Sequence, residues 1–544
     1  MMQLSGIEDL FLRVETPSMP MHISSLTIYD PASAPGGKVG FKDIMRFFEA
    51  RMYRNKVFGH RLVSAPFGLG NSFWAKDPDF DIEFHLRHIA LPKPGDWRQC
   101  CIQLARLHAR HVDVHRPLWE CYVIEGLDNI PGLPEGCFAL LLKTHYAALG
   151  GGLGTQLLAA LHELMPNGRV SPPKHLTRYD GLPGMSDLLR NTLSNSLTWP
   201  VKMGAYLSTY FSPLQMYAGG ALSDLIGWPL RLLRRDPAVE AVPATVFNAP
   251  VSPHRVFEAV SFDLLQLEHM RDAVPGATVN DILIAVIAGA MRHYLAHKGS
   301  LPVASLVAEA PITSRSEMKV DSVRNLADSA IMSIHTDCDE PAERLNRIVA
   351  ETRSNKKNFQ SFLGKRLLID ATDLLPSVLL KTVGELIRRS RLGTRLAPQF
   401  NTTISSIRGP DLPLYMAGAK MVAYYGMDVV HDLAGINHLI CYFAGNATIS
   451  ITACRKMMPD PARYAVCLQD AFVELHGALV APKHPAKAAP ILTLVPTKAA
   501  KPVKPAKPAA KTGTARRRKK TDVPPVATET TTGSVTNAVA DAAS

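Results

Sequence analysis

A chain of 544 residues, 47% of them hydrophobic, is long enough to bury two sizeable cores, so we expect two folded domains. Nine of the twelve net positive charges lie beyond residue 480, where twelve Lys and Arg residues face three acidic ones, so the body is nearly neutral. Eight scattered cysteines without a Cys-x-x-Cys pair argue against a secreted disulfide framework. We see no signal peptide and no apolar run of about 18 residues that would span a membrane.

Apolar periodicity predicts alternating helices and strands in both halves of the chain. In the first half we expect helices over residues 5–14, 41–53 and 97–111, and strands over residues 23–29, 80–89, 121–125 and 137–142. In the second half we expect strands over residues 256–262, 303–308, 330–336, 420–425, 437–443 and 448–454, and helices beginning near residues 278, 341 and 461, with a helical stretch over residues 359–395. Asp460 is the expected cap of the last helix.

Residues 143–158 are the most informative stretch of the chain. A buried strand ends at Lys143-Thr-His145-Tyr146, a glycine run follows at Gly150-Gly151-Gly152, and a helix then begins whose apolar face extends to Leu164 and Met165. Such a strand–turn–helix junction presents side chains and free backbone N–H groups at the end of a sheet, where α/β proteins often hold ligands.

The same stretch resembles the active-site segment of the bacterial wax ester synthase/diacylglycerol acyltransferase family, whose motif is His-His-x-x-x-Asp-Gly. Without a gap, His145 matches the first His and Gly151 the final Gly. Tyr146 stands at the position of the second, catalytic His, and Gly150 at that of the Asp. The resemblance implies that the catalytic positions are His145, Tyr146, Gly150 and Gly151. His145 is either a support of the loop or, if the glycines let the turn re-form, a substitute base.

Further segments carry the resemblance over about residues 3–478. They are Thr16-Pro17 with Pro20-Met21-His22, Pro117-Leu118-Trp119, Asn280-Asp281, and Ser405-Ser406 with Gly409-Pro410, where Ser406 replaces an Asn of the family pattern. We interpret Trp119 as core packing, with a wall of the substrate channel as the alternative. Asp281 lies three residues after Thr278, which predicts a capping box.

By resemblance, the fold is α/β, with two chloramphenicol-acetyltransferase-like domains, each a mixed sheet with flanking helices, and a tunnel at their interface. We place an N-terminal domain at residues 1–170, a helical crossover linker at 171–245 and a C-terminal domain at 246–480. Residues 481–544, rich in Lys, Pro and Ala, are expected to be a disordered tail.

The implied function is acyl-CoA-dependent transfer of a fatty acyl group to diacylglycerol or a long-chain alcohol, with weak activity because Tyr146 and Gly150 depart from the motif. The alternative is an inactive lipid- or CoA-binding paralogue that acts as a partner or a lipid-droplet protein. Acyl-CoA is then a substrate, and neither a bound cofactor nor a metal is expected. We expect a cytoplasmic protein attached peripherally to a membrane or lipid droplet, with a tail that binds anionic lipid or, less readily, nucleic acid.

Overall fold

The computed structural model describes residues 2–65, 70–149, 155–167, 182, 184–198, 201, 204, 242–311, 329–357, 372, 377–390, 398–409 and 412–480. All of them belong to one unit, Met1–Leu494. The glycines at positions 150 and 151, Pro410, most of the expected crossover linker and the whole basic tail lie outside the described residues.

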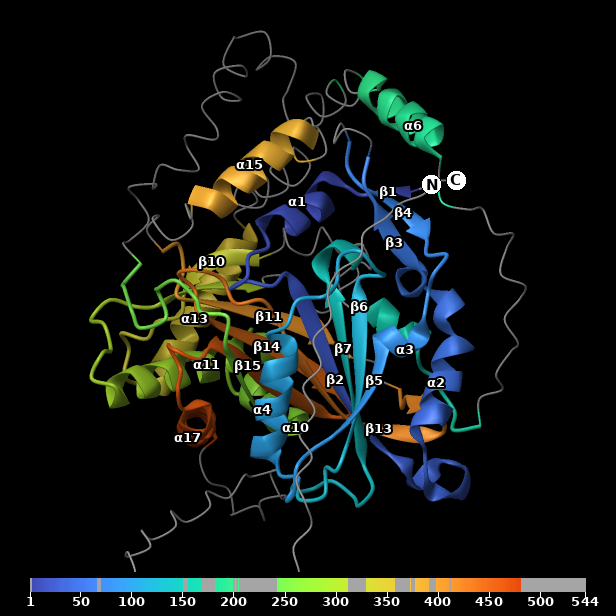
Figure 1. Ribbon diagram of the computed structural model, residues 1–544. Coiled ribbons are helices and arrows are strands. Elements are labelled where there is room, and N and C mark those ends of the chain that lie inside the picture. The colour runs from blue at the N-terminus through green and yellow to red at the C-terminus, as the bar shows by residue number, and fades with distance from the viewer. Residues whose placement is uncertain are drawn as a thin grey trace, which may run out of the picture. The chain divides into compact units, whose positions relative to one another are not determined.

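The N-terminal sheet has six strands in the order β12-β13-β2-β7-β6-β5, and only the β5–β6 pair is parallel. Its strands are β2 (His22–Asp30), β5 (Leu86–Ala90), β6 (Trp119–Glu125), β7 (Phe138–His145), β12 (Tyr415–Met416) and β13 (Ala419–Met427). Strand β7 is buried along its whole length, as its run of apolar residues predicts for a central strand. The sheet is completed from far along the chain, because β13 pairs with β2 (Figure 1).

Helices cover both faces of this sheet. α2 (Phe41–Glu49) packs through Ile44, Phe47 and Phe48 against one face, in a cluster with side chains of β2, β6 and β7. α4 (Trp97–His108) packs against the other face and also against β8 (Arg255–Asp263) of the second sheet. Since α4 touches both sheets, it helps to fix one half of the molecule against the other.

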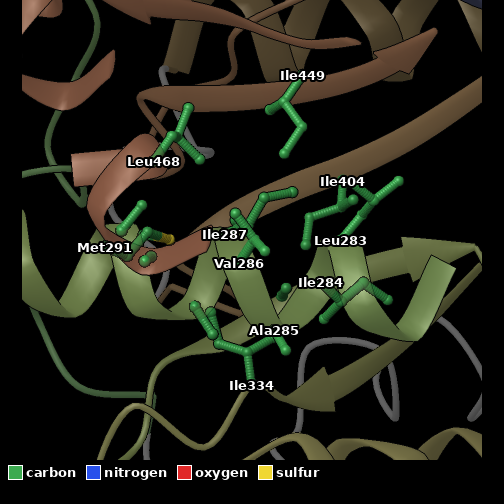
Figure 2. Close-up of a cluster of buried hydrophobic side chains, with 14 of the residues drawn as sticks. Leu283, Ile284, Ala285, Val286, Ile287, Met291, Ile334, Ile404, Ile449 and Leu468 are labelled. Carbon is green, nitrogen blue, oxygen red and sulfur yellow. The ribbon is translucent and has the colours of Figure 1, made fainter. Parts of the chain in front are cut away.

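The C-terminal sheet also has six strands, in the order β10-β9-β11-β14-β15-β8. The strands besides β8 are β9 (Val307–Pro311), β10 (Ser329–Ser333), β11 (Thr402–Arg408), β14 (Ile436–Phe443) and β15 (Asn446–Cys454). Helix α11 (Val279–His297) covers one face of this sheet together with α13 (Pro341–Lys357) and α17 (Pro461–Leu479). Figure 2 shows its side chains packed towards Ile404 and Ile449 of the sheet and Leu468 of α17.

The other face of the C-terminal sheet turns towards the N-terminal half. Leu439, Cys441 and Phe443 of β14 join Met421 and Tyr424 of β13 in one buried cluster. The remaining elements include a three-stranded sheet of β1 (Met2–Gln3), β3 (His60–Val63) and β4 (Phe73–Lys76), and the helices α1 (Gly6–Val14), α3 (Ile82–His85), α5 (Thr155–Ala160), α6 (Met185–Leu197), α10 (Leu264–Asp272) and α15 (Ser377–Ser390).

Most predicted elements are confirmed, and four predictions are wrong in part. Residues 80–89 hold the short helix α3 before β5 rather than one strand. The strand predicted at 303–308 begins at Val307, and Val303 is 96% exposed. α5 ends at Ala160, so Leu164 and Met165 are not on its face. Asp460 begins α17 without a side-chain capping bond, because its carboxylate accepts hydrogen bonds from Tyr294 and Lys298.

Helix α11 explains an apolar segment that the sequence analysis underrated. By length and composition alone it is the one helix among the described residues that could cross a membrane. However, 72% of its apolar window is buried within the C-terminal core. Its composition is therefore accounted for by packing against β11, β15 and α17 (Figure 2).

Candidate active site

The two strands that flank β2 bring together residues that are far apart in the sequence. β7 and β13 both pair antiparallel with β2, so they run in the same direction and end at the same edge of the sheet. His145, the last residue of β7, lies opposite His22, and Met427, the last residue of β13, lies opposite Ser24. The first residues beyond the two strands, Tyr146 and Asp428, therefore meet.

The hydroxyl group of Tyr146 donates a hydrogen bond of 2.5 Å to Oδ1 of Asp428. This distance is typical of a charge-assisted O–H···O⁻ bond. The Tyr146 backbone N–H donates to the Met21 carbonyl, and its ring packs 5.2 Å from that of Phe11 on α1. Tyr146 is half-buried and Asp428 is buried, so the pair lies inside the molecule at one edge of the N-terminal sheet.

Tyr146 is held in its protonated form. Burial raises its pKa well above the ordinary value of a phenol, and the charge of Asp428 and the hydrogen bond to it raise it further. A phenol in this state cannot accept a proton in the way that a neutral imidazole does. Its own proton points at Asp428.

His145 is fully buried, and its side chain lies beside Ala147 and Glu15. Its Nδ1 accepts a hydrogen bond of 3.0 Å from the Ala147 N–H, which makes it the cap of the short 3₁₀ turn Tyr146–Ala148. Its Nε2 therefore carries the proton, and it lies 3.7 Å from Oε2 of Glu15. Nδ1 thus holds the loop, whereas Nε2 has no hydrogen-bond partner among the described residues and lies only within ion-pair distance of Glu15. The bond to Nδ1 favours the supporting role for His145 over that of a substitute base.

Glu15 ties the loop before His22 to the end of β7. Its carboxylate accepts hydrogen bonds from the Met21 N–H and from His111. Burial alone would raise its pKa, but the bonds with His111, His145 and Met21 outweigh burial and lower the pKa to about 2. Glu15 is therefore a charged anchor for the segment that contains Met21 and His22.

Two buried histidines position the end of β13. His108, at the end of α4, lies 3.3 Å from the Asp428 carbonyl through Nε2 and 2.8 Å from the Ser24 hydroxyl through Nδ1. Nε2–H is thus the donor to the carbonyl, and Nδ1 accepts from Ser24. Burial lowers the pKa of His108 to about 3, so this ring is neutral. His22 is also fully buried and donates through Nε2 to the His108 carbonyl, which agrees with a structural role.

The Pro117-Leu118-Trp119 segment packs in the core beside this loop. Trp119 is fully buried, donates from Nε1 to the Phe58 carbonyl at 3.1 Å and stacks on His85. Leu118 packs against Ala147, and its carbonyl accepts the His145 N–H at 3.0 Å. The segment therefore supports the loop from within the core, as the packing interpretation predicts.

The remaining predicted positions lie on the C-terminal half. Asp281 accepts from the Thr278 N–H at 2.8 Å and donates its own N–H to the Thr278 hydroxyl, so the predicted capping box of α11 is present; Asn280 lies beside it in the first turn. Ser405 and Ser406 lie on β11. Among the described residues, no hydrogen bond links Ser405 or Ser406 to Tyr146.

Comparison with known families decides what kind of protein carries this site. The catalytic-domain profile of the wax ester synthase/diacylglycerol acyltransferase family matches residues 4–283, and its C-terminal-domain profile matches residues 325–476. The chain belongs to this family. Residues 145, 146 and 428, which form the junction, lie within the two matched ranges.

Curated relatives match nearly the whole body of the chain. A putative diacylglycerol O-acyltransferase of Mycobacterium tuberculosis is 30% identical over 488 residues, which is 88% of this chain and 100% of that protein. An O-acyltransferase of Acinetobacter baylyi is 28% identical over 502 residues, 90% of this chain and 100% of its own length. Among solved structures, the wax ester synthase/diacylglycerol acyltransferase of Marinobacter aquaeolei has a TM-score of 0.58 at 24% identity, covering 87% of this chain and 98% of its own.

The structural match and the two mixed sheets confirm the expected two-domain fold. Asp428, Glu15 and His108 belong to the site but were not predicted from the sequence. The sequence did contain a signal for Glu15, because this residue directly precedes the Thr16-Pro17 segment that resembles the family. Asp428 had a weaker one, as a carboxylate at the end of an apolar strand. Nothing in the sequence indicated that this strand joins the N-terminal sheet.

Proposed function

We propose that this chain transfers a fatty acyl group from acyl-CoA to a hydroxyl group at a low rate, forming triacylglycerol from diacylglycerol, wax ester from a fatty alcohol, or both. Family membership over both halves supports the reaction class. The observation that carries the proposal is the hydrogen bond between Tyr146 and Asp428, because it keeps a polar pair at the position of the family's base.

The chemistry of the reaction explains why a changed residue is tolerated there. A thioester is already activated, so the protein has to accept a proton from the attacking hydroxyl and to stabilise the developing oxyanion. Loss of a positioned base typically costs on the order of 100- to 10,000-fold in rate. Tyr146 is not itself a base, so we expect turnover below that of relatives with an imidazole at this position.

We also propose that acyl-CoA and the alcohol reach the pair through a tunnel between the two halves, from opposite sides. This is supported by Tyr146, which is only half-buried and is flanked by Phe11 and Asp428, two residues far apart in the sequence. Such a tunnel exposes the thioester and the hydroxyl group to the pair while keeping the acyl chain away from water.

A second candidate is an inactive paralogue that binds lipid or CoA. The protonated state of Tyr146 favours it, since the residue at the catalytic position then has no basic form near pH 7. In this case the fold and the binding surface would be retained and the reaction lost.

Ester formation by the purified full chain separates the two candidates. Labelled palmitoyl-CoA would be incubated with diacylglycerol or hexadecanol, and binding of palmitoyl-CoA would be measured separately. Slow ester formation supports the transferase. Binding without any ester, followed by activity in Tyr146→His with Gly150→Asp, supports the paralogue. Protein that neither binds palmitoyl-CoA nor forms ester contradicts both candidates.

We propose a peripheral location on a lipid surface, supported by an exposed apolar patch. Leu164, Met165 and Leu412 are 58%, 71% and 59% exposed, and all lie within three residues of the bridge between Glu163 and Tyr415.

Co-flotation with phosphatidylcholine vesicles tests the patch. These vesicles lack net charge, so they exclude the contribution of the basic tail. Replacing the three by Ser should reduce co-flotation, whereas Ser at the matched exposed positions Leu265, Val303 and Val473 should not. Equal flotation of both variants argues against the patch.

A further inference from the structure

The Tyr146 hydroxyl donates its one hydrogen bond, but the lone pairs of its oxygen can still accept hydrogen bonds. A phenol O–H donates one hydrogen bond and can accept others. Its proton goes to Asp428, and no described residue donates a hydrogen bond to the phenol oxygen. A substrate hydroxyl that reaches this oxygen can therefore donate to it while the existing bond to Asp428 stays in place.

The carboxylate of Asp428 has one oxygen, Oδ2, that can take up a proton. Its Oδ1 accepts from the Tyr146 hydroxyl at 2.5 Å and from the Val429 N–H at 2.8 Å, and no described residue donates to Oδ2. The His108 ring holds the Asp428 backbone carbonyl, which fixes the carboxylate at the end of β13. An oriented carboxylate with a proton donor already aimed at it is the arrangement expected of a general base.

We propose, resting on the acyltransferase function above, that Asp428 is the proton acceptor of the reaction and that the Tyr146 hydroxyl relays the proton to it. The alcohol oxygen attacks the thioester carbonyl carbon and forms the new C–O bond. Its proton passes to the Tyr146 oxygen as the Tyr146 proton passes to Asp428.

The tetrahedral intermediate then breaks its C–S bond, and CoA leaves as the thiolate. The proton returns from Asp428 through Tyr146 to the sulfur, which gives CoA thiol and ester and restores the starting pair. The relay needs no free tyrosinate, so the raised pKa of Tyr146 does not block it. One proton crosses each of two hydrogen bonds in a single step.

Among the described residues, three other titratable side chains interact with Asp428 from the elements around it. His108 on α4 is neutral and has both ring nitrogens engaged. Burial raises the pKa of the Cys441 thiol on β14, so it stays protonated. His431 lies three residues after Asp428; burial lowers its pKa, while Asp428, Glu309 and Asp432 oppose this change. No described residue forms a hydrogen bond with the His431 ring, so His431 is the rival acceptor.

The experiment measures kcat and KM for palmitoyl-CoA with the acceptor alcohol that the wild-type chain uses. The variants are Tyr146→Phe, Asp428→Asn, the double variant and His431→Gln. Tyr294→Phe is a matched control, because Tyr294 donates a bond of 2.6 Å to Asp460 at the start of α17. Palmitoyl-CoA binding and circular dichroism verify that each variant is folded.

We expect Tyr146→Phe and Asp428→Asn each to lower kcat by on the order of 100-fold or more, with KM for palmitoyl-CoA nearly unchanged. The double variant should be no slower than the slower single variant, because the two residues act as one unit. His431→Gln and Tyr294→Phe should stay within about threefold of the wild type. In the wild type, a proton inventory in mixed H₂O and D₂O should be curved, as two protons in flight require.

Normal rates in Asp428→Asn and Tyr146→Phe, or a loss confined to His431→Gln, would overturn the relay and leave the transferase function standing. A wild-type chain that binds palmitoyl-CoA but forms no ester overturns both.

Discussion

His145 has its Nε2 3.7 Å from Oε2 of Glu15, which is within ion-pair distance but too far for a hydrogen bond. The other nitrogen accepts the Ala147 N–H. The first position of the motif thus stabilises the turn that presents the second position. Glu15, 130 residues earlier in the sequence, is the acid that fixes this arrangement.

Replacing Glu15 by Gln should destabilise the fold in a pH-dependent way. The pKa of Glu15 is lowered to about 2, so its charged form contributes stability above the unfolded value of about 4.5 that is lost as the pH falls towards 2. This corresponds to on the order of 3 kcal/mol at pH 7. Denaturant unfolding at several pH values should show the deficit of Glu15→Gln at pH 7 and its decline towards pH 3.

The control for this prediction is an exposed pair of the same type. Glu125 lies 3.0 Å from His88, and both side chains are about two-fifths exposed. Glu125→Gln should change the free energy of unfolding by less than about 1 kcal/mol, because solvent screens exposed pairs. Equal losses of unfolding free energy in both variants would mean that the burial of Glu15 does not strengthen its interactions.

Substitutions of His145 should separate support of the loop from catalysis. In His145→Asn the side-chain oxygen can still accept the Ala147 N–H, as asparagine does at many helix caps. We expect its acyl-transfer rate to stay within about tenfold of the wild type. His145→Ala loses the cap and should lower the free energy of unfolding by about 1 to 3 kcal/mol. A loss of 100-fold or more in a folded His145→Asn protein would instead identify His145 as a base.

Gly409 is required by a close approach of two backbones. A Cβ atom at this position would lie 2.3 Å from the Tyr442 carbonyl oxygen, which accepts the Gly409 N–H. Gly409→Ala should therefore cost about 1 to 3 kcal/mol in unfolding free energy through overpacking. Gly477, exposed on α17 with no atom within 4 Å of a Cβ, is the matched control, and Gly477→Ala should be neutral or stabilise by up to about 1 kcal/mol. Similar melting temperatures of the two variants would contradict the prediction.

Apolar periodicity identified most strands but not the sheet to which each belongs. β13 has the same apolar character as β14 and β15 and closely precedes them in sequence, yet it pairs with β2. Its partner is chosen by packing between Met421 and Tyr424 of β13 and the N-terminal core, which no local pattern encodes. For the same reason, the contact between Tyr146 and Asp428 could not be predicted, since 282 residues separate them.

Local capping and backbone pairing explain the smaller errors in the predicted helices and strands. Asp81 accepts the Glu83 N–H and starts a helical turn inside a segment that alternates like a strand. β9 begins at Val307 because its backbone pairs there with Asn401, whose side chain and N–H both bond to it. The motif itself could be located from sequence because its strand, turn and glycines are contiguous.

The contact between α4 and β8 gives a last prediction about the junction of the two halves. Trp97 donates from Nε1 to Oε1 of Glu258 at 2.5 Å, and Glu258 is buried. Burial raises the pKa of Glu258 despite the bonds from Trp97 and the Ala259 N–H. The wild type should then gain stability as Glu258 takes up a proton at low pH and lose it as the pH rises through the raised value.

Glu258→Gln keeps an acceptor for Trp97 and removes the buried charge, so at pH 7 it should unfold at the same or higher denaturant concentration than the wild type. The advantage should shrink as the pH falls through the raised value and disappear below about 4.5, where the wild-type carboxyl group becomes protonated in both states. Trp97→Phe leaves the carboxylate without its main donor and should cost about 1 to 3 kcal/mol at pH 7. If Glu258→Gln were the less stable protein at pH 7, the charged carboxylate would be holding the two halves together rather than opposing their contact.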